Sequence, residues 1–295
     1  MDRAAADALL ASLGGDRSVF RYFEGRYALQ LLAYALCDAR ERFRPLLQKP
    51  SIRRLIGERG GRGVDWALLD AYFPPGSQRY VLTFARWGDE SDDAWFQTTR
   101  PGFNLVVQLN FPPTHERAYR RYVAPRSGDP FVWHGHPVRT GDLLTMSWSR
   151  IDLEFAHGEA LIEEVQSDWI RDAQAAGAEA LARLVEGDAA CDAVDIFRYV
   201  EYVLAPHRRI WAEATLAASL WLLRERLGIR QIYYHTHESG SALKRIRGWH
   251  PPRSLYETLP RAFCFERVDG LPAFLPRSVA GRTAPRRPEF WRLTL

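Results

Sequence analysis

The segment ALIEEVQSDWIRDA, residues 160–173, changes within one short run from the alternating pattern of a strand to the spacing of a helix. A strand that leads directly into a helix favours a fold in which helices cover a sheet. The strand part nevertheless carries four polar residues, namely Glu163, Glu164, Gln166 and Asp168, where a buried strand is normally rich in apolar residues. We therefore expect these side chains to line a functional site.

The periodicity of the remaining chain divides it into a helical front and a longer mixed part. Up to about residue 75, apolar residues recur every three or four positions, and one such stripe contains Phe20, Phe23, Tyr27, Leu31 and Tyr34. From about Ser77 the pattern alternates, which predicts strands at 78–87, 104–111, 143–155, 160–169 and 229–236 and a closing hairpin within 262–275. A long helix over 207–228 precedes the last single strand.

These elements predict an α+β fold. A helical N-terminal region, residues 1–75, packs on a mostly antiparallel central sheet. The sheet belongs to a core domain, residues 76–275, and a basic tail rich in Pro and Arg, residues 276–295, follows it. We expect this tail to be extended and solvated.

Alternation places Glu164, Gln166 and Asp168 on one side of their strand and Glu163 on the other. If the hairpin pairs Glu154 with Ala160, then Arg150 lies opposite Glu164 and Trp148 lies opposite Gln166. A shift of one residue would bring Ser149 and Ile151 to this face instead.

A third strand adds amides to the expected polar face, because Asn104, Gln108 and Asn110 share one side of residues 104–111. An ordinary half-exposed sheet would give a similar pattern. Amides and an aromatic residue on such a face favour a site with fixed hydrogen-bonding partners. Trp148 and Trp169 flank the site and could stack on a planar substrate.

The composition restricts the class of protein. No stretch is long and apolar enough to span a bilayer, and the first residues lack the apolar core of a secretory signal. The three cysteines, Cys37, Cys191 and Cys264, form no disulfide framework, so we expect a reduced, cytoplasmic protein. The net charge of +4 and pI near 9.0 come almost entirely from scattered arginines.

The run EEVQSDW resembles a motif found in uncharacterised segments of very large phage polyvalent proteins. The matching residues are Arg150, Glu163, Glu164, Gln166, Ser167, Asp168 and Trp169, and the later run WAEATLAASLWLLRERLGIRQIYYHT fits the same pattern. The similarity covers roughly residues 147–237. It implies an association with phages or mobile elements and brings no established activity.

The order of predicted elements also resembles that of GNAT-type acyltransferases: a meander, a central strand, a helix, a strand, a helix and a strand pair. This resemblance implies acyl-CoA as donor, with its pyrophosphate held by a glycine-rich loop directly after the central strand. The nearest equivalent here, residues 174–179 with Gly177, lies later and inside an alanine-rich helix.

We therefore expect a cytoplasmic group-transfer enzyme that moves an acyl or aminoacyl group to an amine on a small molecule or peptide. Glu164 and Asp168 would act in acid–base catalysis, and their proximity would raise the pKa of one of them. Arg150, Gln166, Glu163 and the strand amides would bind substrate, and His235 or His237 would accept the proton.

Two alternatives remain open from the sequence. The first is a binding module whose polar face and aromatic residues hold a peptide or nucleic acid, aided by the arginine-rich tail. The second is a metal-dependent hydrolase that uses His134 with His136, or His235 with His237, because residues two apart on a strand share a face. We assign no metal.

Overall fold

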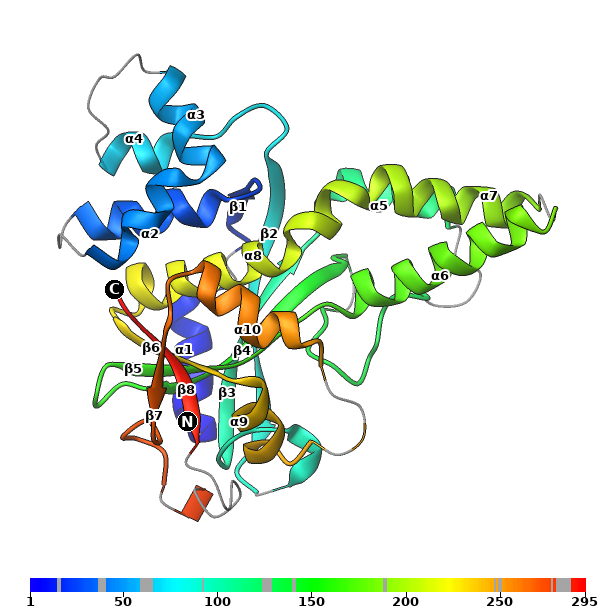
Figure 1. Ribbon diagram of the computed structural model, residues 1–295. Coiled ribbons are helices and arrows are strands. Elements are labelled where there is room, and N and C mark those ends of the chain that lie inside the picture. Colours follow the sequence, from blue (N-terminus) through cyan, green and yellow to red (C-terminus); the bar gives the residue numbers. More distant parts are fainter. Residues whose placement is uncertain are drawn as a thin grey trace.

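A computed structural model gives the structure of the chain. It describes residues 1–14, 17–36, 41–58, 66–91, 93–123, 129–139, 142–187, 190–246, 248, 251–276, 278–279 and 288–295. Within these residues the chain forms an α+β fold built on one mostly antiparallel sheet, as expected from the sequence (Figure 1).

The sheet has eight strands in the order β1-β2-β3-β4-β5-β6-β8-β7 among the described residues. They are β1 (Val19–Tyr22), β2 (Gln78–Asp89), β3 (Gly102–Asn110), β4 (Thr145–Glu154), β5 (Glu159–Gln166), β6 (Gln231–His235), β7 (Glu266–Asp269) and β8 (Glu289–Thr294). Among the strand pairs of the described residues, β5 with β6 is parallel and the others are antiparallel. A parallel pair requires a long crossover, which the helices between β5 and β6 provide.

Helices account for most of the remaining described chain. The α-helices are α1 (Arg3–Leu13), α2 (Arg26–Leu36), α3 (Pro50–Glu58), α4 (Trp66–Ala71), α5 (Pro113–Tyr122), α6 (Asp168–Val185), α7 (Cys191–Arg198), α8 (Ala205–Trp221), α9 (His237–Leu243) and α10 (Arg253–Ala262). Short 3-10 segments, η1 (Glu41–Gln48) and η2 (Ala94–Phe96), and π-helical segments, η3 (Tyr199–Val203) and η4 (Leu222–Arg226), adjoin them.

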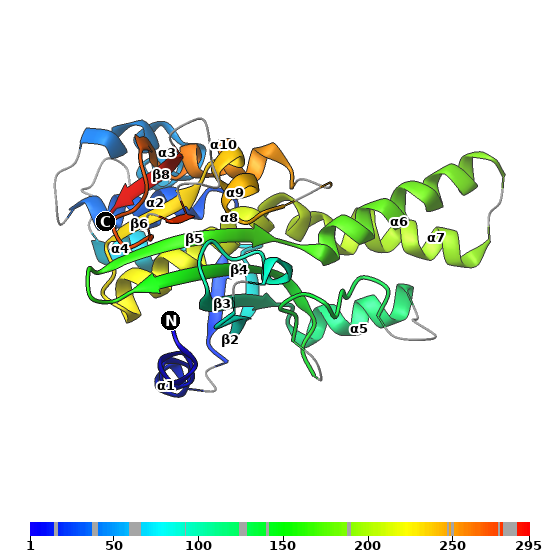
Figure 2. The ribbon, with the colours of Figure 1, turned by 90° about the horizontal axis from the view of Figure 1, so that it is seen from below.

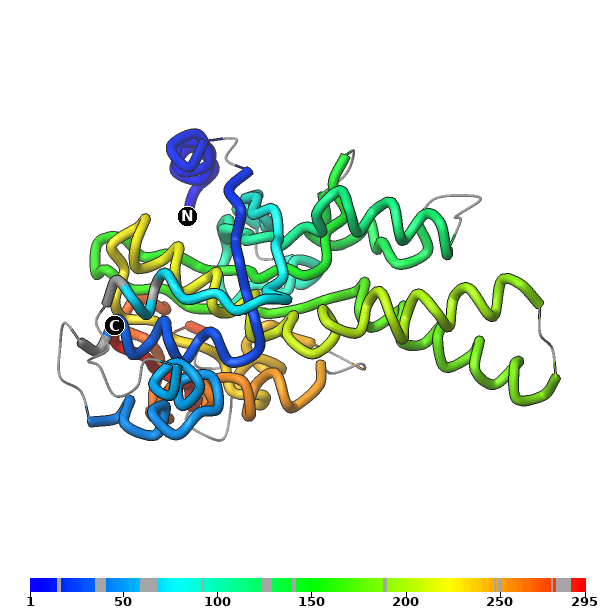
Figure 3. Tube along the Cα trace, turned by 90° about the horizontal axis from the view of Figure 1, so that it is seen from above, coloured from blue at the N-terminus to red at the C-terminus, as the bar shows by residue number. Residues whose placement is uncertain are grey.

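The helices cover both faces of the sheet. Helix α8 contacts β3, β4 and β5, and α2 packs on α8. Helix α1 contacts β2 and β3, and it lies on the opposite side of the sheet from α2–α4 (Figure 3). Helices α6 and α7 form an arm that projects from the body (Figures 1 and 2).

The central strands are buried on both faces, so the sheet has no wet side there. All residues of β3, and all of β4 and β5 except Glu154 and Gln166, are buried. On the α8 face the hydroxyl groups of Ser147 and Ser149 pair with those of Thr215 and Ser219, each at 2.7 Å. The half-exposed sheet considered above is therefore wrong for these strands.

The front of the chain differs from its predicted helical stripe. Val19–Tyr22 form β1, which pairs with β2, and α2 begins only at Arg26. Phe20 therefore lies in an edge strand. Side chains two residues apart on a strand lie on the same face, so Phe20 shares a face with Tyr22, which is fully buried in the core.

The C-terminal segments also differ from expectation. Strand β7 pairs with β8 rather than with residues 271–275, so the closing hairpin within 262–275 is wrong. Residues 289–294 of the predicted tail form β8, with Phe290 and Leu293 fully buried. Because their apolar side chains are buried, the prediction of a solvated tail is wrong for residues 289–294. Most of 277–287 lies outside the described residues.

Among the described residues, no helix is both long and apolar enough to cross a membrane. Cys191 and Cys264 are free thiols, and Cys37 lies outside the described part of the chain.

Candidate functional site

A β-bulge at Glu163 sets the geometry of the polar face. The predicted pairs Arg150 with Glu164 and Trp148 with Gln166 are present. The turn, however, pairs Glu154 with Glu159 rather than with Ala160, and the register shifts between Arg150 and Ile151. Because Glu163 is an extra residue in β5, Arg150 still pairs with Glu164 and Trp148 still pairs with Gln166.

Glu163 belongs to a closed hydrogen-bonded cluster. Its carboxylate accepts from the Thr99 N–H at 2.9 Å and from the Thr99 hydroxyl at 2.8 Å. His235 Nε2 lies 3.0 Å from the same carboxylate, and His235 Nδ1 lies 3.1 Å from the hydroxyl of Ser239. Because Glu163 and His235 are fully buried and already paired, this cluster fixes the segment near Thr99 rather than receiving a substrate.

Burial alone would raise the pKa of Glu163, but the hydrogen bond and charge of His235, with Lys244 nearby, lower that pKa to about 2. Burial lowers the pKa of His235, and the hydrogen bond and charge of Glu163 oppose that change. The structure places this predicted proton acceptor in the protein interior.

Glu164 lies in a second buried group with Arg150 and Lys244. The Arg150 guanidinium donates to the Glu164 carboxylate, and it also donates to the main-chain oxygens of Phe96 and Gln97. Lys244 Nζ lies 3.9 Å from Glu164 Oε2. The same guanidinium lies 5.7 Å from the ring centre of Trp87 and 5.8 Å from that of Trp148.

The Lys244 side chain lies at the point where the pairing of β5 with β6 ends. Their ladder ends at Ile162 and Tyr234, so Glu163 has no partner residue on β6. The Lys244 ammonium donates instead to the main-chain oxygen of Glu163 at 2.9 Å and to the Tyr256 hydroxyl at 3.3 Å. The buried amine thus satisfies a carbonyl that the sheet leaves open.

Asp168 begins α6 and orients His136. His136 Nδ1 lies 2.9 Å from Asp168 Oδ2, and Gln166 Nε2 donates to Asp168 Oδ1 at 2.7 Å. Arg171 also donates to Oδ1 at 2.8 Å, and the indole N–H of Trp148 donates to Oδ2 at 3.4 Å. Gln166 Nε2 also lies 3.0 Å from His136 Nδ1. In the tautomer in which Nδ1 donates to the Asp168 carboxylate, Nε2 is the acceptor of the ring.

The two carboxylates predicted to share a raised pKa do not do so. Burial raises the pKa of each, but Lys244 and Arg150 lower the pKa of Glu164 below its usual value, and His136 lowers that of Asp168. Arg150 pairs with Glu164 and Arg171 pairs with Asp168, so both carboxylates are held ionised and neither is a general acid near neutral pH, and this part of the prediction is wrong.

Two cavities meet at Glu164. The first, of about 60 Å³, is an aromatic pocket lined by Trp87, Trp95, Phe96, Gln97, Gly135, His136, Trp148, Arg150 and Glu164. The second, of about 190 Å³, is an apolar slot lined by Glu164, Val165, Gln166, Ser167, Ile170, Arg171, Gln174, Trp211, Pro251, Pro252 and Leu255. The carboxylate lies between them, with its side chain 8% exposed.

The strand amides tie the sheet together. Gln108 accepts from the Thr83 hydroxyl at 2.8 Å and donates to the main-chain oxygen of Pro137, which anchors the loop that carries His136. Asn110 donates to Thr83 Oγ1 and to the main-chain oxygen of Val81. Asn104 is also buried. We infer that Gln108 and Asn110 position the site rather than contact a substrate.

Trp169 and His237 lie apart from the two cavities. The Trp169 indole donates to the Tyr199 hydroxyl at 2.8 Å and packs against Phe111 and Tyr119 in the core. His237 begins α9 and packs edge-on against Tyr256. Trp169 is therefore buried in the core, and its ring does not line either cavity, so it is not placed to stack on a substrate there.

Neither histidine pair forms a metal centre in the described part of the chain. No group of three His, Cys, Asp or Glu residues there could hold a metal ion. His235 ends β6 and His237 begins a helix, so the two do not share a strand face. His134 is exposed, whereas His136 turns to Asp168.

Two residues, His136 and Thr99, were not predicted from the sequence in the roles that they have in the structure. His136 was considered only as a metal ligand, although the run HGHP puts it in a turn-rich loop that can approach the sheet. Thr99 carried no signal, because its role depends on the fold of residues 96–99 over β5.

Comparison of the chain with protein-family models, with curated proteins and with solved structures found no match.

Proposed function

We propose that the protein is a cytoplasmic group-transfer enzyme that moves an acyl or aminoacyl group to an amine. The observation that carries this proposal is the Asp168–His136 pair at the aromatic pocket, 2.9 Å apart, beside a second cavity that meets the pocket at Glu164. An imidazole that is oriented by a carboxylate is a common general base in enzymes.

The small pocket suits the acceptor amine. Its aromatic walls favour a flat amine that enters in its uncharged form, because Arg150 already pairs with the Glu164 carboxylate. His136 Nε2 would take the proton as the amine nitrogen bonds to the acyl carbon. The bond from that carbon to the leaving sulfur or oxygen breaks, and the leaving group takes up the proton that His136 removed from the amine.

The apolar slot suits the acyl donor. It runs between α6 and α10, with Ile170, Trp211 and Leu255 as apolar walls. The start of α6, however, carries the buried carboxylate of Asp168, which would repel a pyrophosphate at that helix end. The residues therefore do not fit the pyrophosphate of coenzyme A at this position, and we propose a thioester or ester donor that is bound through its apolar part.

The element order supports the proposal. A meander, β2–β5, is followed by helices, the parallel strand β6, further helices and the strand pair β7–β8. This order resembles that of the GNAT-type acyltransferases. The alternative of a phage-associated binding module remains an outcome of the test, because pocket and aromatic residues alone would also hold a ligand without turnover.

The test measures acyl transfer from acetyl-CoA, a short acetyl thioester and an aminoacyl ester to a panel of amines. His136→Gln should lower kcat by about 10²–10⁴-fold, the usual contribution of a general base. Asp168→Asn should lower it by a similar factor because the ring loses its orientation. His134→Gln, two residues away and exposed, is the matched control and should retain activity.

Amine binding with no turnover in wild-type protein, and with unchanged affinity in His136→Gln, would instead support the binding module. Turnover that His136→Gln leaves intact would contradict the proposed role of His136.

A further inference from the structure

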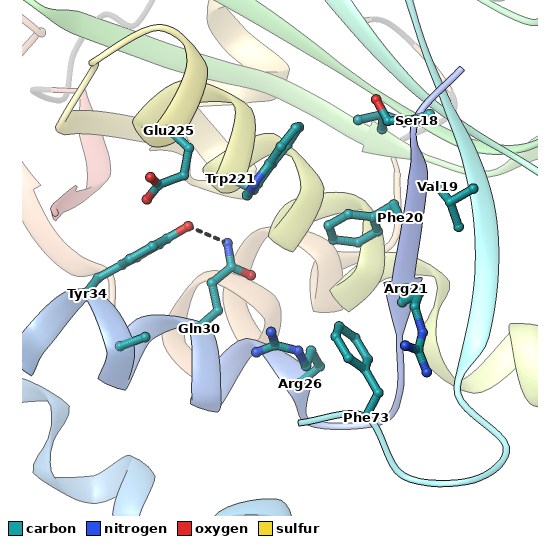
Figure 4. A pocket seen from close by; sticks show the side chains of 12 residues that line it. Ser18, Val19, Phe20, Arg21, Arg26, Gln30, Tyr34, Phe73, Trp221 and Glu225 are labelled. Carbon is teal, nitrogen blue, oxygen red and sulfur yellow. Dashed lines mark hydrogen bonds between the residues drawn. The ribbon is translucent and has the colours of Figure 1, made fainter. Parts of the chain in front are cut away.

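A third cavity lies on the other side of the molecule from the arm and shares no lining residue with the two described above. It has a volume of about 390 Å³ and lies between β1, α2 and the end of α8 with η4 (Figure 4). Its walls include Phe20, Arg26, Gln30, Phe73 and Trp221. The volume falls within the range of small-molecule sites.

The cavity is electropositive on one side. The guanidinium of Arg26, a residue only 7% exposed, lies 4.9 Å from the ring centre of Phe73. The exposed Arg21 lies 4.2 Å from the same ring. On the other side the carboxylate of Glu225 is 3.2 Å from the Arg224 guanidinium, which offsets its charge. An anion that enters the cavity therefore gains from both arginines near Phe73.

The sheet edge places a further arginine beside Arg21. Strand β1 pairs Arg21 directly with Arg79 of β2. Like charges directly opposite each other destabilise a strand pair. An anion near Arg21 would relieve this repulsion.

The remaining walls suit a flat ring with a hydrogen-bonding edge. The rings of Phe20 and Trp221 lie on the side of the cavity away from Arg26 (Figure 4). Gln30 Nε2 donates at 3.0 Å to the main-chain oxygen of Ala217, which can only accept, and also lies 3.0 Å from the Tyr34 hydroxyl. This bond fixes the amide, and Gln30 Oε1 points away from Tyr34 toward the cavity, where it can accept from a ring N–H (Figure 4).

We propose that this cavity binds a planar aromatic ligand that carries one anionic group, either the phosphate of a nucleotide or the carboxylate of an aromatic acid. The ring lies against Trp221 and Phe20, its N–H edge faces Gln30, and the anion lies at Arg26 and Arg21. The site is distinct from the proposed acyl-transfer site.

Calorimetry with the full chain tests the proposal. The probes are adenosine 5′-monophosphate with adenosine and phosphate, and indole-3-acetate with indole. We expect one of the two anionic ring compounds to bind at least tenfold more tightly than its uncharged ring and than phosphate alone. The compound that binds identifies the source of the anion.

Two variants locate the binding. Arg26→Gln should weaken it at least tenfold, and Arg21→Gln, at an exposed position where folding is not at risk, should weaken it about threefold or more. Arg209→Gln, also exposed but on the far part of α8, is the matched control and should bind as wild type.

Binding of neither anionic compound would overturn the proposal. Equal binding of the charged and uncharged rings would do so as well, as would binding that Arg21→Gln leaves unchanged.

Discussion

At the scale of single residues, Lys244 is unusual because its side chain is fully buried. It is also one of only two lysines in the chain. Burial lowers the pKa of Lys244, and Glu164 opposes that change. Its hydrogen bonds to Glu163 and Tyr256 make it a connector between β5, α9 and α10. A residue that reads from the sequence as a surface cation is therefore part of the interior.

Replacing this residue tests that role. Lys244→Met should lower the free energy of unfolding by about 2 kcal/mol, because it leaves the Glu163 carbonyl unsatisfied in the interior. Urea unfolding measures the change. Lys49→Met, the matched control, removes the other lysine from a half-buried position and should cost less than about 1 kcal/mol. An unchanged midpoint for Lys244→Met would show that water replaces the amine.

At the scale of elements, Gly177 shows what a glycine does inside a helix. The sequence places it inside an alanine-rich helix, and it lies in the middle of α6. A Cβ on this residue would lie 2.9 Å from Val200 Cγ1 of η3. The glycine therefore permits close approach of two segments of the arm and its base.

We expect Gly177→Ala to destabilise the protein by about 1 kcal/mol, since the clash outweighs the better helix propensity of alanine. Thermal unfolding measures it. The double variant Gly177→Ala with Val200→Ala should be at least as stable as Val200→Ala alone. Gly57→Ala in α3, where nothing lies within 4 Å of the added Cβ, should be neutral or stabilising. A destabilising Gly57→Ala would argue against this explanation.

The sequence predicted the elements of the sheet centre better than its edges. Strands β2–β5 follow from alternation, and the facing of Arg150 and Glu164 follows from it as well. The bulge at Glu163 could not be predicted, because it depends on pairing with β4 and on contacts with Thr99, far away in the chain. Strands β1 and β8 were missed for a related reason: short edge or inserted strands are specified by the partner strands, not by their own pattern.

At the scale of the whole molecule, two buried histidines should make stability depend on pH. Burial lowers the pKa of His115 to about 2 and that of His207 to about 4. An unfolded histidine has a pKa near 6.5. Because both values are lower in the folded protein, the unfolded state binds more protons below pH 6.5. The stabilisation is thus full above that pH and is lost as the pH falls.

Between pH 6 and 5 the free energy of unfolding should therefore fall by roughly 1 kcal/mol for each of these histidines. Chemical unfolding at the two pH values measures the slope. The slope should shrink by about that amount in His115→Gln and in His207→Gln. It should stay at the wild-type value in His134→Gln, whose side chain is exposed. A slope that all three variants share would assign the effect to other groups.

The position of β8 between β6 and β7 has a consequence for the order of events during synthesis. Strands β6 and β7 leave the ribosome before β8, which pairs with both of them. Until β8 emerges, β7 has no partner strand and one edge of β6 is unpaired. An open edge pairs readily with other chains. The nascent chain is thus exposed to aggregation until residues 289–294 emerge, because only then does β7 gain its partner strand.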